Sequence, residues 1–186
     1  MADPQTKPEI LQTLRALHER STRYWSAFSD SDFLAPIGEA WSPADNVRHL
    51  DKSVRAVVRG LGIPKPLLFL LFGPSPRASR DYGGLRDVYR GILAGGGKAG
   101  RFAPAPETLP ADPAAWRRAL MGRRELAAEA LERAIEPWSE TALDRYRMPH
   151  PLLGKLTVRE MLFFTLYHNL HHVQNVARRT GIAFAA

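Results

Sequence analysis

Apolar side chains recur every three or four residues in four long segments of the chain, which is the spacing of an amphipathic α-helix. The first segment covers about residues 8–28, and its apolar stripe consists of Ile10, Leu14, Leu17, Tyr24, Trp25 and Phe28. The second covers 43–62, where the inward-facing residues are Leu50, Val54, Val57 and Leu61. Beside this second stripe runs a line of small and polar residues that leaves space next to an imidazole: Asn46, His49, Ser53, Ala56 and Gly60.

The third and fourth helices are expected at 113–135 and 157–179. Arg123 falls near the middle of the third stripe, which is formed by Trp116, Leu120, Ala127, Leu131 and Ala134. An arginine there either extends to water along its apolar stem or reaches a cavity and binds an anion. The buried face of the fourth helix is expected to hold Met161, Leu162, Thr165, Leu166, His168, Asn169, His172, Val173 and Val176.

The ends of these helices carry recognisable signals. Two of them begin with a capping residue followed by proline, at Ser42-Pro43 and at Asp112-Pro113. Thr157 and Glu160 form a capping box at the start of the fourth helix, and Gly181 permits a left-handed stop at its end.

Residues 63–111 form a long connection between the second and third helices that is rich in proline and glycine. One short amphipathic helix is expected within it, from the spacing of Leu85, Val88, Tyr89, Ile92 and Leu93. A connection of this length often serves as a lid or a binding loop. No segment alternates in a way that predicts a sheet. We therefore predict an all-α fold, a four-helix bundle in a single domain over residues 1–186.

Composition narrows the class of protein. The chain has 186 residues, of which 45% are hydrophobic and 24% charged, as is usual for a folded domain with a sizeable core. No signal-peptide pattern follows Met1, and the longest apolar run, 67–72, is too short to span a bilayer. The chain has no cysteine, which excludes disulfides, thiolate ligands and a cysteine nucleophile. We expect a cytoplasmic protein without a membrane partner.

The chain is basic, with 26 Lys and Arg against 19 Asp and Glu and a net charge of +7. A clustered basic patch would indicate nucleic-acid binding. The arginines are instead scattered and interleaved with acidic residues, so nucleic acid is not the expected partner. The positive field would favour an acidic small-molecule substrate or a thiol cofactor.

Two histidines of the fourth helix, His168 and His172, are four residues apart, so their side chains point about 40° apart around the axis. Such a pair can bind one metal ion, and His49 on the second helix can complete a three-histidine site. His171 lies about 60° from His168, toward the edge of the face. From spacing alone, a purely structural pair is the alternative, although two buried imidazoles need polar partners. Three protein ligands leave a coordination position open, as in catalytic sites, and imidazoles suit zinc, nickel, copper or iron.

Other residues with chemical potential have plainer alternatives. His150, between two prolines before the fourth helix, either contacts a substrate, acts as an acid or base, or is an exposed loop histidine. His18 flanks the first stripe and is expected to be structural. The glycine-rich segment 95–100 lacks the strand and the Lys-Ser/Thr pair of a phosphate-binding loop, so we interpret it as a flexible loop.

Taken together, these motifs resemble the DinB-like superfamily, which includes YfiT-like proteins, mycothiol-dependent maleylpyruvate isomerase and bacillithiol transferases. The resemblance rests on three segments: Trp41-Ser42-Pro43 with His49, the run from His150 to Thr157, and the His-x-x-His-His of His168, His171 and His172. It implies that His49, His168 and His172 are the metal ligands. The family often has glutamine seven residues after the first histidine of the last helix, where this chain has Asn175.

The resemblance implies a divalent-metal-dependent enzyme (Zn, Ni or Fe) that activates a low-molecular-weight thiol or water, as a thiol S-transferase or a hydrolase. His150 and Arg123 are candidate catalytic or substrate-binding residues. The alternative is a non-catalytic metal-binding protein with a stress or interaction role, and a third hypothesis is a basic nucleic-acid binder. Relatives commonly dimerise, so a homodimer is expected.

Overall fold

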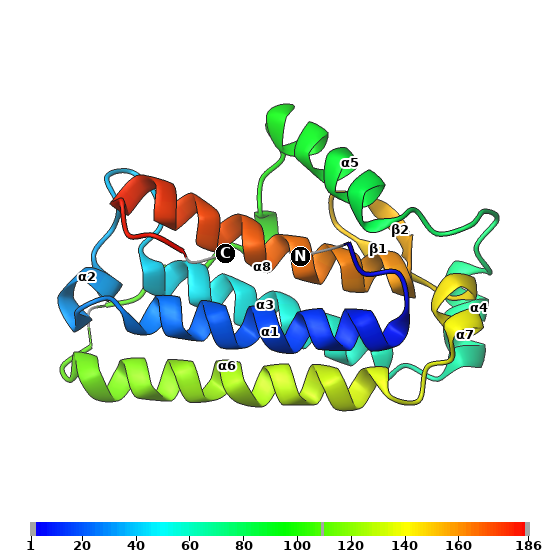
Figure 1. The fold of residues 1–186 in the computed structure, drawn as a ribbon, viewed down its shortest axis with the longest axis horizontal. Helices are drawn as coiled ribbons and strands as arrows, with labels where there is room; N and C mark the ends of the chain where they lie inside the picture. The colour runs from blue at the N-terminus through cyan, green and yellow to red at the C-terminus, as the bar shows by residue number, and fades with distance from the viewer. Residues whose placement is uncertain (1–2, 109, 185–186) are drawn as a thin grey trace.

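The computed structural model describes residues 3–108 and 110–184. Four long helices run side by side and form a bundle (Figure 1), namely α1 (Lys7–Ser26), α3 (Pro43–Leu61), α6 (Pro113–Ile135) and α8 (Val158–Thr180). Helix α3 packs against α6 and α8, and α1 packs against the same two helices. The predicted four-helix bundle is therefore confirmed.

The start of each long helix is fixed by the local signal in its sequence. Side chains of Thr6, Ser42, Asp112 and Thr157 each accept a hydrogen bond from the backbone N–H three residues on. These bonds satisfy N–H groups that have no partner within the helix. Helix α8 ends at Gly181, whose φ of +72° is a left-handed conformation that glycine adopts at low cost.

The long proline- and glycine-rich connection is largely folded. It contains α4 (Lys65–Phe72), α5 (Tyr82–Ala94) and the short 3-10 helix η1 (Gly100–Phe102). Helix α5 is the one expected from the sequence, and it packs along α8 (Figure 1). Two further short helices cap the bundle, α2 (Asp30–Leu34) at one end and α7 (Glu140–Arg145) at the other.

A short β-hairpin precedes α8, so the expectation that the chain has no sheet is wrong. Strand β1 (Arg147–His150) pairs antiparallel with β2 (Gly154–Thr157), in a register that sets His150 opposite Gly154. Each strand has four residues, which is too few for an alternating pattern of apolar and polar residues to be recognised. Pro149 also argues against a strand, because proline cannot donate a ladder hydrogen bond. The hairpin packs on α8 and brings His150 to the bundle.

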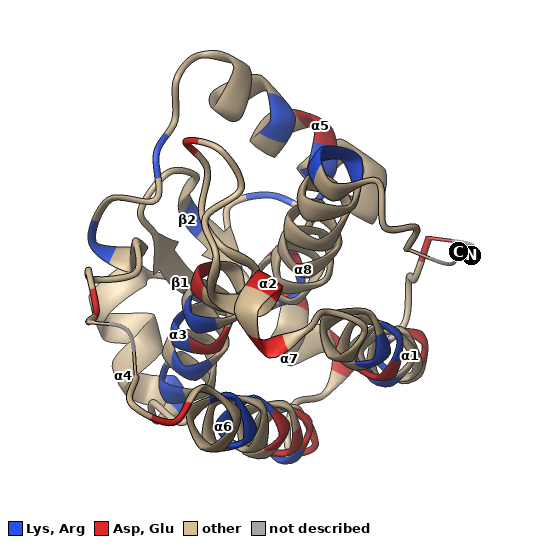
Figure 2. Ribbon diagram, turned by 90° about the vertical axis from the view of Figure 1, so that its left-hand side faces the viewer, with Lys and Arg blue, Asp and Glu red and all other residues tan. Residues whose placement is uncertain are grey.

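The first half of helix α8 is buried on all sides. Side chains from Val158 to Leu166 are all buried, and the core extends from them in two clusters. One cluster lies under the hairpin, α4 and α7, and the other lies toward α2. Among the described residues no helix is both long and apolar enough to cross a membrane. Basic and acidic positions are interspersed over the elements (Figure 2).

The apolar stripe of α6 passes through Arg124, so the placement of Arg123 in that stripe is wrong. Arg123 is exposed, whereas Arg124 is 5% exposed. Position 124 is four residues after Leu120 and three before Ala127, so it is the position that completes the helical repeat. The Arg124 guanidinium is buried because it donates hydrogen bonds to oxygens and a ring nitrogen of α1, those of Ser21, Thr22 and His18.

Candidate metal centre

Three histidines from α3 and α8 meet in the interior of the bundle. The Nε2 atom of His168 lies 2.9 Å from Nε2 of His49 and 3.1 Å from Nε2 of His172. His49 and His168 are each 4% exposed. The packing of α3 on α8 thus brings together residues that are 119 positions apart in the chain.

Hydrogen bonds on the far side of two rings fix their orientation and tautomer. Nδ1 of His49 lies 2.8 Å from the carbonyl oxygen of Phe102, and Nδ1 of His172 lies 2.7 Å from Oδ1 of Asn46. An oxygen of this kind only accepts, so each Nδ1 carries the proton and each Nε2 presents a lone pair. Nδ2 of Asn46 donates to the carbonyl oxygen of Ser42, which fixes the direction of the amide.

The three Nε2 atoms fit a metal ion better than they fit one another. The Nε2 atoms of His49 and His172 are unprotonated. Without a metal, a single proton on Nε2 of His168 would have to form hydrogen bonds with both of them. Zinc–nitrogen bonds at a tetrahedral angle separate two ligand nitrogens by about 3.3 Å, close to the spacings found here. A ligand set of three imidazoles suits zinc, nickel or iron, and the outer hydrogen bonds to oxygen are those that metal-binding histidines usually make.

Burial keeps the three rings neutral, which is the form that binds metal. It lowers the pKa of His49, and it holds the pKa of His168 well below the usual range, with further lowering from His172 and His49. Burial, and then His49, does the same to the pKa of His172. A neutral imidazole keeps a lone pair free for a cation.

Aromatic rings hold the histidines in place. The ring of Trp41 stacks on that of His172, with an interplanar angle of 8° and centroids 6.1 Å apart. The ring of Phe164 stacks on that of His168 at 4.8 Å. Trp41 immediately precedes the cap of α3, so the segment that leads into this helix also covers the cluster.

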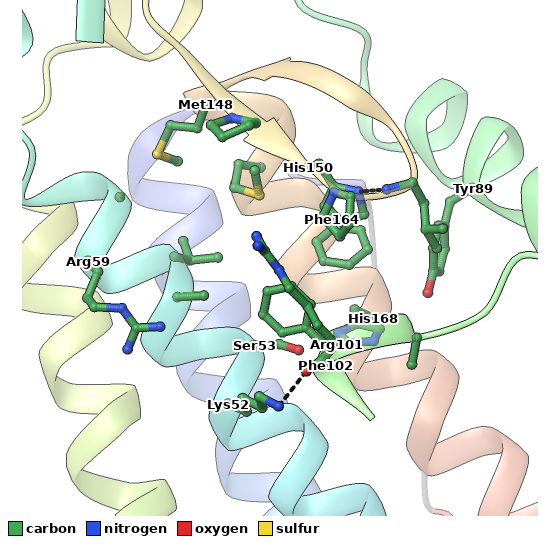
Figure 3. Close-up of a pocket in the computed structure, with 18 of the residues that line it drawn as sticks. Lys52, Ser53, Arg59, Tyr89, Arg101, Phe102, Met148, His150, Phe164 and His168 are labelled. Carbon is green, nitrogen blue, oxygen red and sulfur yellow. Dashed lines mark hydrogen bonds between the residues drawn. The ribbon is translucent and has the colours of Figure 1, made fainter. Parts of the chain in front are cut away.

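A cavity of about 680 Å³ opens beside His168 (Figure 3). Its walls come from α3, α4, α5, η1, β1 and α8, so the folded connection forms part of it. The small residues that were expected to leave space next to His49, namely Ser53, Ala56 and Gly60, line this cavity. Most of its other lining is apolar, including Leu68, Phe72, Met161 and Phe164.

The remaining candidates from the sequence lie in different places. His150 is 9% exposed and lines the cavity on β1, so it is not an exposed loop histidine. Arg123 does not line the cavity. His171 bonds to Asn175 outside the cluster, so the shorter amide at position 175 contacts a different ring from those of the cluster. His18 pairs with Glu125 and Arg124 and is structural, as expected.

Two contributors to the site were not identified from the sequence as partners of the histidines. Asn46 lies one helical turn before His49 on α3, and this spacing was a usable signal for a residue beside the cluster. The carbonyl oxygen of Phe102 belongs to a segment far away in the sequence. No side-chain pattern can reveal a main-chain acceptor of that kind.

Comparison with known proteins agrees with the fold described above. The chain superposes on YfiT from Bacillus subtilis with a TM-score of 0.63 and 15% sequence identity, covering 98% of this chain and 94% of that chain. YfiT is described as a probable metal-dependent hydrolase with an unusual four-helix bundle topology. No curated protein matches the chain. The sequence model of the DinB superfamily matches residues 13–176, and the chain therefore belongs to the DinB superfamily.

Proposed function

We propose that this protein is a metal-dependent enzyme in which His49, His168 and His172 hold one divalent ion, Zn, Ni or Fe, beside the substrate cavity. The observation that carries the proposal is the convergence of three Nε2 atoms, two of them held as lone-pair donors by Phe102 and Asn46, with His168 also lining the cavity. Three protein ligands leave a position open for a reactant, as in catalytic sites.

A divalent ion held there would act as a Lewis acid, lowering the pKa of a water or thiol at the open position. The reaction is then either hydrolysis or transfer of a low-molecular-weight thiol to an electrophile. The chain has no cysteine, so such a thiol would be a separate molecule. The description of YfiT as a probable metal-dependent hydrolase favours testing hydrolysis first.

His150 supplies a hydrogen-bond donor to the cavity. Its Nδ1 atom accepts hydrogen bonds from the backbone N–H groups of Leu152 and Leu153, at 3.2 and 3.1 Å. Burial lowers the pKa of His150 to about 4, so the ring is neutral at pH 7. A neutral ring that accepts at Nδ1 carries its proton on Nε2. His150 therefore holds this proton for a substrate carbonyl or leaving-group oxygen and orients the substrate.

Aromatic side chains and the segment containing η1 form the part of the cavity nearest His168. Phe164 packs against both His150 and His168, with ring centroids 4.2 and 4.8 Å away. The segment containing η1 is tied to His49 by the Phe102 carbonyl and forms a wall of the cavity. Polar interactions with a substrate are stronger in such a largely apolar site than in water.

The test compares the metal content of protein purified without an affinity tag, for wild type, His168→Ala and His171→Ala. His171→Ala is the matched control because it removes a neighbouring histidine of α8 that lies outside the cluster. We expect about one divalent ion per chain in wild type and His171→Ala, and loss of it in His168→Ala. Absence of metal from the wild type, with no uptake of added Zn²⁺ or Ni²⁺, would refute the proposal.

Activity is then measured on the loaded protein with a panel of esters and amides, and with thiols paired with electrophiles. Turnover that disappears in His168→Ala supports the enzyme. Full metal loading with no turnover in either panel would favour the non-catalytic metal-binding alternative.

A further inference from the structure

The cavity beside the three histidines is apolar in its body and basic at its rim. Lys52, Arg59 and Arg101 contribute to its lining, and all three are exposed. None of the described residues that line it is an aspartate or a glutamate. Figure 3 shows Arg101 reaching from η1 into the space between α3 and His150.

These three cations differ from several arginines of the protein that pair with carboxylates. Arg48, Arg55 and Arg117, for example, each form an ion pair with an acidic side chain. Across the part of the chain that the structure describes, no carboxylate lies within ion-pair distance of Lys52, Arg59 or Arg101. The positive charge at this rim is therefore available to a ligand.

The geometry of the rim is set by two elements. Lys52 and Arg59 are seven residues apart on α3, so their side chains leave the same face of the helix. Lys52 donates a hydrogen bond to the carbonyl oxygen of Arg101, which ties η1 to α3. The Arg101 guanidinium lies 5.4 Å from the centroid of the Phe102 ring, so its planar head is held beside an aromatic wall.

The body of the cavity suits a hydrocarbon or aromatic group. Val57, Ile63 and Leu68 line it together with Phe72, Met161 and Phe164. Its volume of about 680 Å³ lies within the range of sites that enclose a small organic molecule. Such a ligand can bury its apolar part and keep its charge at the basic rim, which avoids the cost of burying an ion.

We propose that this cavity binds organic acids with an apolar body, the carboxylate paired with Arg59 or Arg101 and the body directed toward His150 and His168. A guanidinium fork matches the two oxygens of a carboxylate, which is why arginine is favoured at such positions. This inference rests on the proposed function, because it names the substrate class of the same site.

The test uses 4-phenylbutyrate and its neutral amide, 4-phenylbutyramide, as probes, with binding measured by calorimetry. Titrations are made on the chelator-treated protein and on the metal-loaded protein. We expect the acid to bind about tenfold tighter than the amide, and propionate, which lacks the body, to bind more weakly than 4-phenylbutyrate. The preference for acid over amide should fall to about twofold or less in the double variant Arg59→Gln/Arg101→Gln.

Arg118→Gln is the control, because it removes one positive charge at an exposed position of α6. It should keep the preference for the acid. Equal binding of acid and amide by the wild type would overturn the inference. It would also be overturned if Arg118→Gln lost as much of the preference for the acid as the double variant does. Binding of the acid to the chelator-treated protein does not require a metal ion. A failure of the acid to bind would therefore be distinguished from a failure of the three histidines to bind metal. Circular dichroism verifies that each protein used remains helical.

Discussion

At the scale of single residues, the candidate site depends on which ring nitrogen carries a proton. His49 and His172 are held with the proton on Nδ1, whereas His150 accepts at Nδ1 and carries its proton on Nε2. The sequence predicted the position of the histidines through helical spacing. It could not predict their tautomers, because the deciding partners are a main-chain carbonyl, an amide and two backbone N–H groups.

Asn46 is expected to control metal affinity through His172. Asn46→Leu removes the acceptor of the Nδ1 proton, so the ring loses its fixed tautomer and orientation. We expect the affinity for Zn²⁺ to fall by about 10- to 100-fold in a competitive titration. Asn175→Leu removes a similar amide from His171 and should change the affinity by less than about twofold. Equal losses in the two variants would contradict this role for Asn46.

His150 is expected to make stability depend on pH. Its folded-state pKa is about 4, below the value of about 6.5 for an unfolded histidine. The unfolded chain therefore binds a proton that the folded protein does not. The contribution of His150 to the free energy of unfolding is therefore complete above about pH 6.5 and is lost as the pH drops toward 4.

Urea denaturation of metal-free protein at pH 7 and pH 5 measures this effect. Between these two pH values the wild type should lose about 1–2 kcal/mol more unfolding free energy than His150→Gln. The buried histidines of the cluster act in the same direction, but they are present in both proteins and cancel in the comparison. An identical loss in both proteins would show that His150 titrates normally.

At the scale of elements, long helices with explicit caps were predictable and short elements were not. The start of α8 at Thr157 follows from its capping box, and the i,i+4 histidines then lie on its buried face. Helix α4 and the β-hairpin have eight and four residues per element, so periodicity had too little length to act on. Tertiary contacts with α8 and with each other stabilise them instead.

The start of α8 is also joined to the long connection by a buried carboxylate. Glu160 is fully buried and accepts hydrogen bonds from the guanidinium groups of Arg77 and Arg80. Burial alone would raise the pKa of Glu160, but the hydrogen bonds from Arg77 and from the backbone of Arg80 and Thr157 lower it overall. The carboxylate therefore stays ionised and holds residues 77–80 against α8.

Glu160→Gln is expected to lower the free energy of unfolding by about 1–3 kcal/mol, because a neutral amide cannot satisfy both arginines. The matched control is Glu132→Gln, which removes a more exposed pair with Arg15 and should cost less than about 1 kcal/mol. Urea denaturation at pH 7 measures both. Equal effects would indicate that the buried network adds nothing beyond a surface ion pair.

At the scale of the whole molecule, the predicted bundle and the observed bundle agree, while the site is more composite than the sequence indicated. The sequence placed the predicted metal ligands on two helices. In the structure the connection between α3 and α6 contributes η1, a carbonyl acceptor, a basic side chain and part of α4 to the same cavity. Such contacts join segments that are distant in the chain, so the local spacing of side chains does not reveal them.

Metal binding is expected to stabilise the whole bundle, because the ligands join α3 to α8. At a free Zn²⁺ concentration about 100 times the dissociation constant, linkage adds about 2.7 kcal/mol to the free energy of unfolding. For a chain of this size, that corresponds to an increase of about 5–10 °C in the melting temperature. Differential scanning calorimetry should find this increase in the wild type and not in His168→Ala. An equal increase in both would place the ion elsewhere.

The bond between His49 and residue 102 has a consequence for how such proteins can vary. The acceptor is a peptide oxygen, which every amino acid has. A substitution at position 102 therefore keeps the acceptor for the Nδ1 proton of His49. Insertion or deletion between residues 95 and 111 would move that oxygen away. Substitutions in the segment containing η1 can therefore change the cavity wall for new ligands without loss of this hydrogen bond. The length of the segment, rather than its side chains, is expected to be constrained.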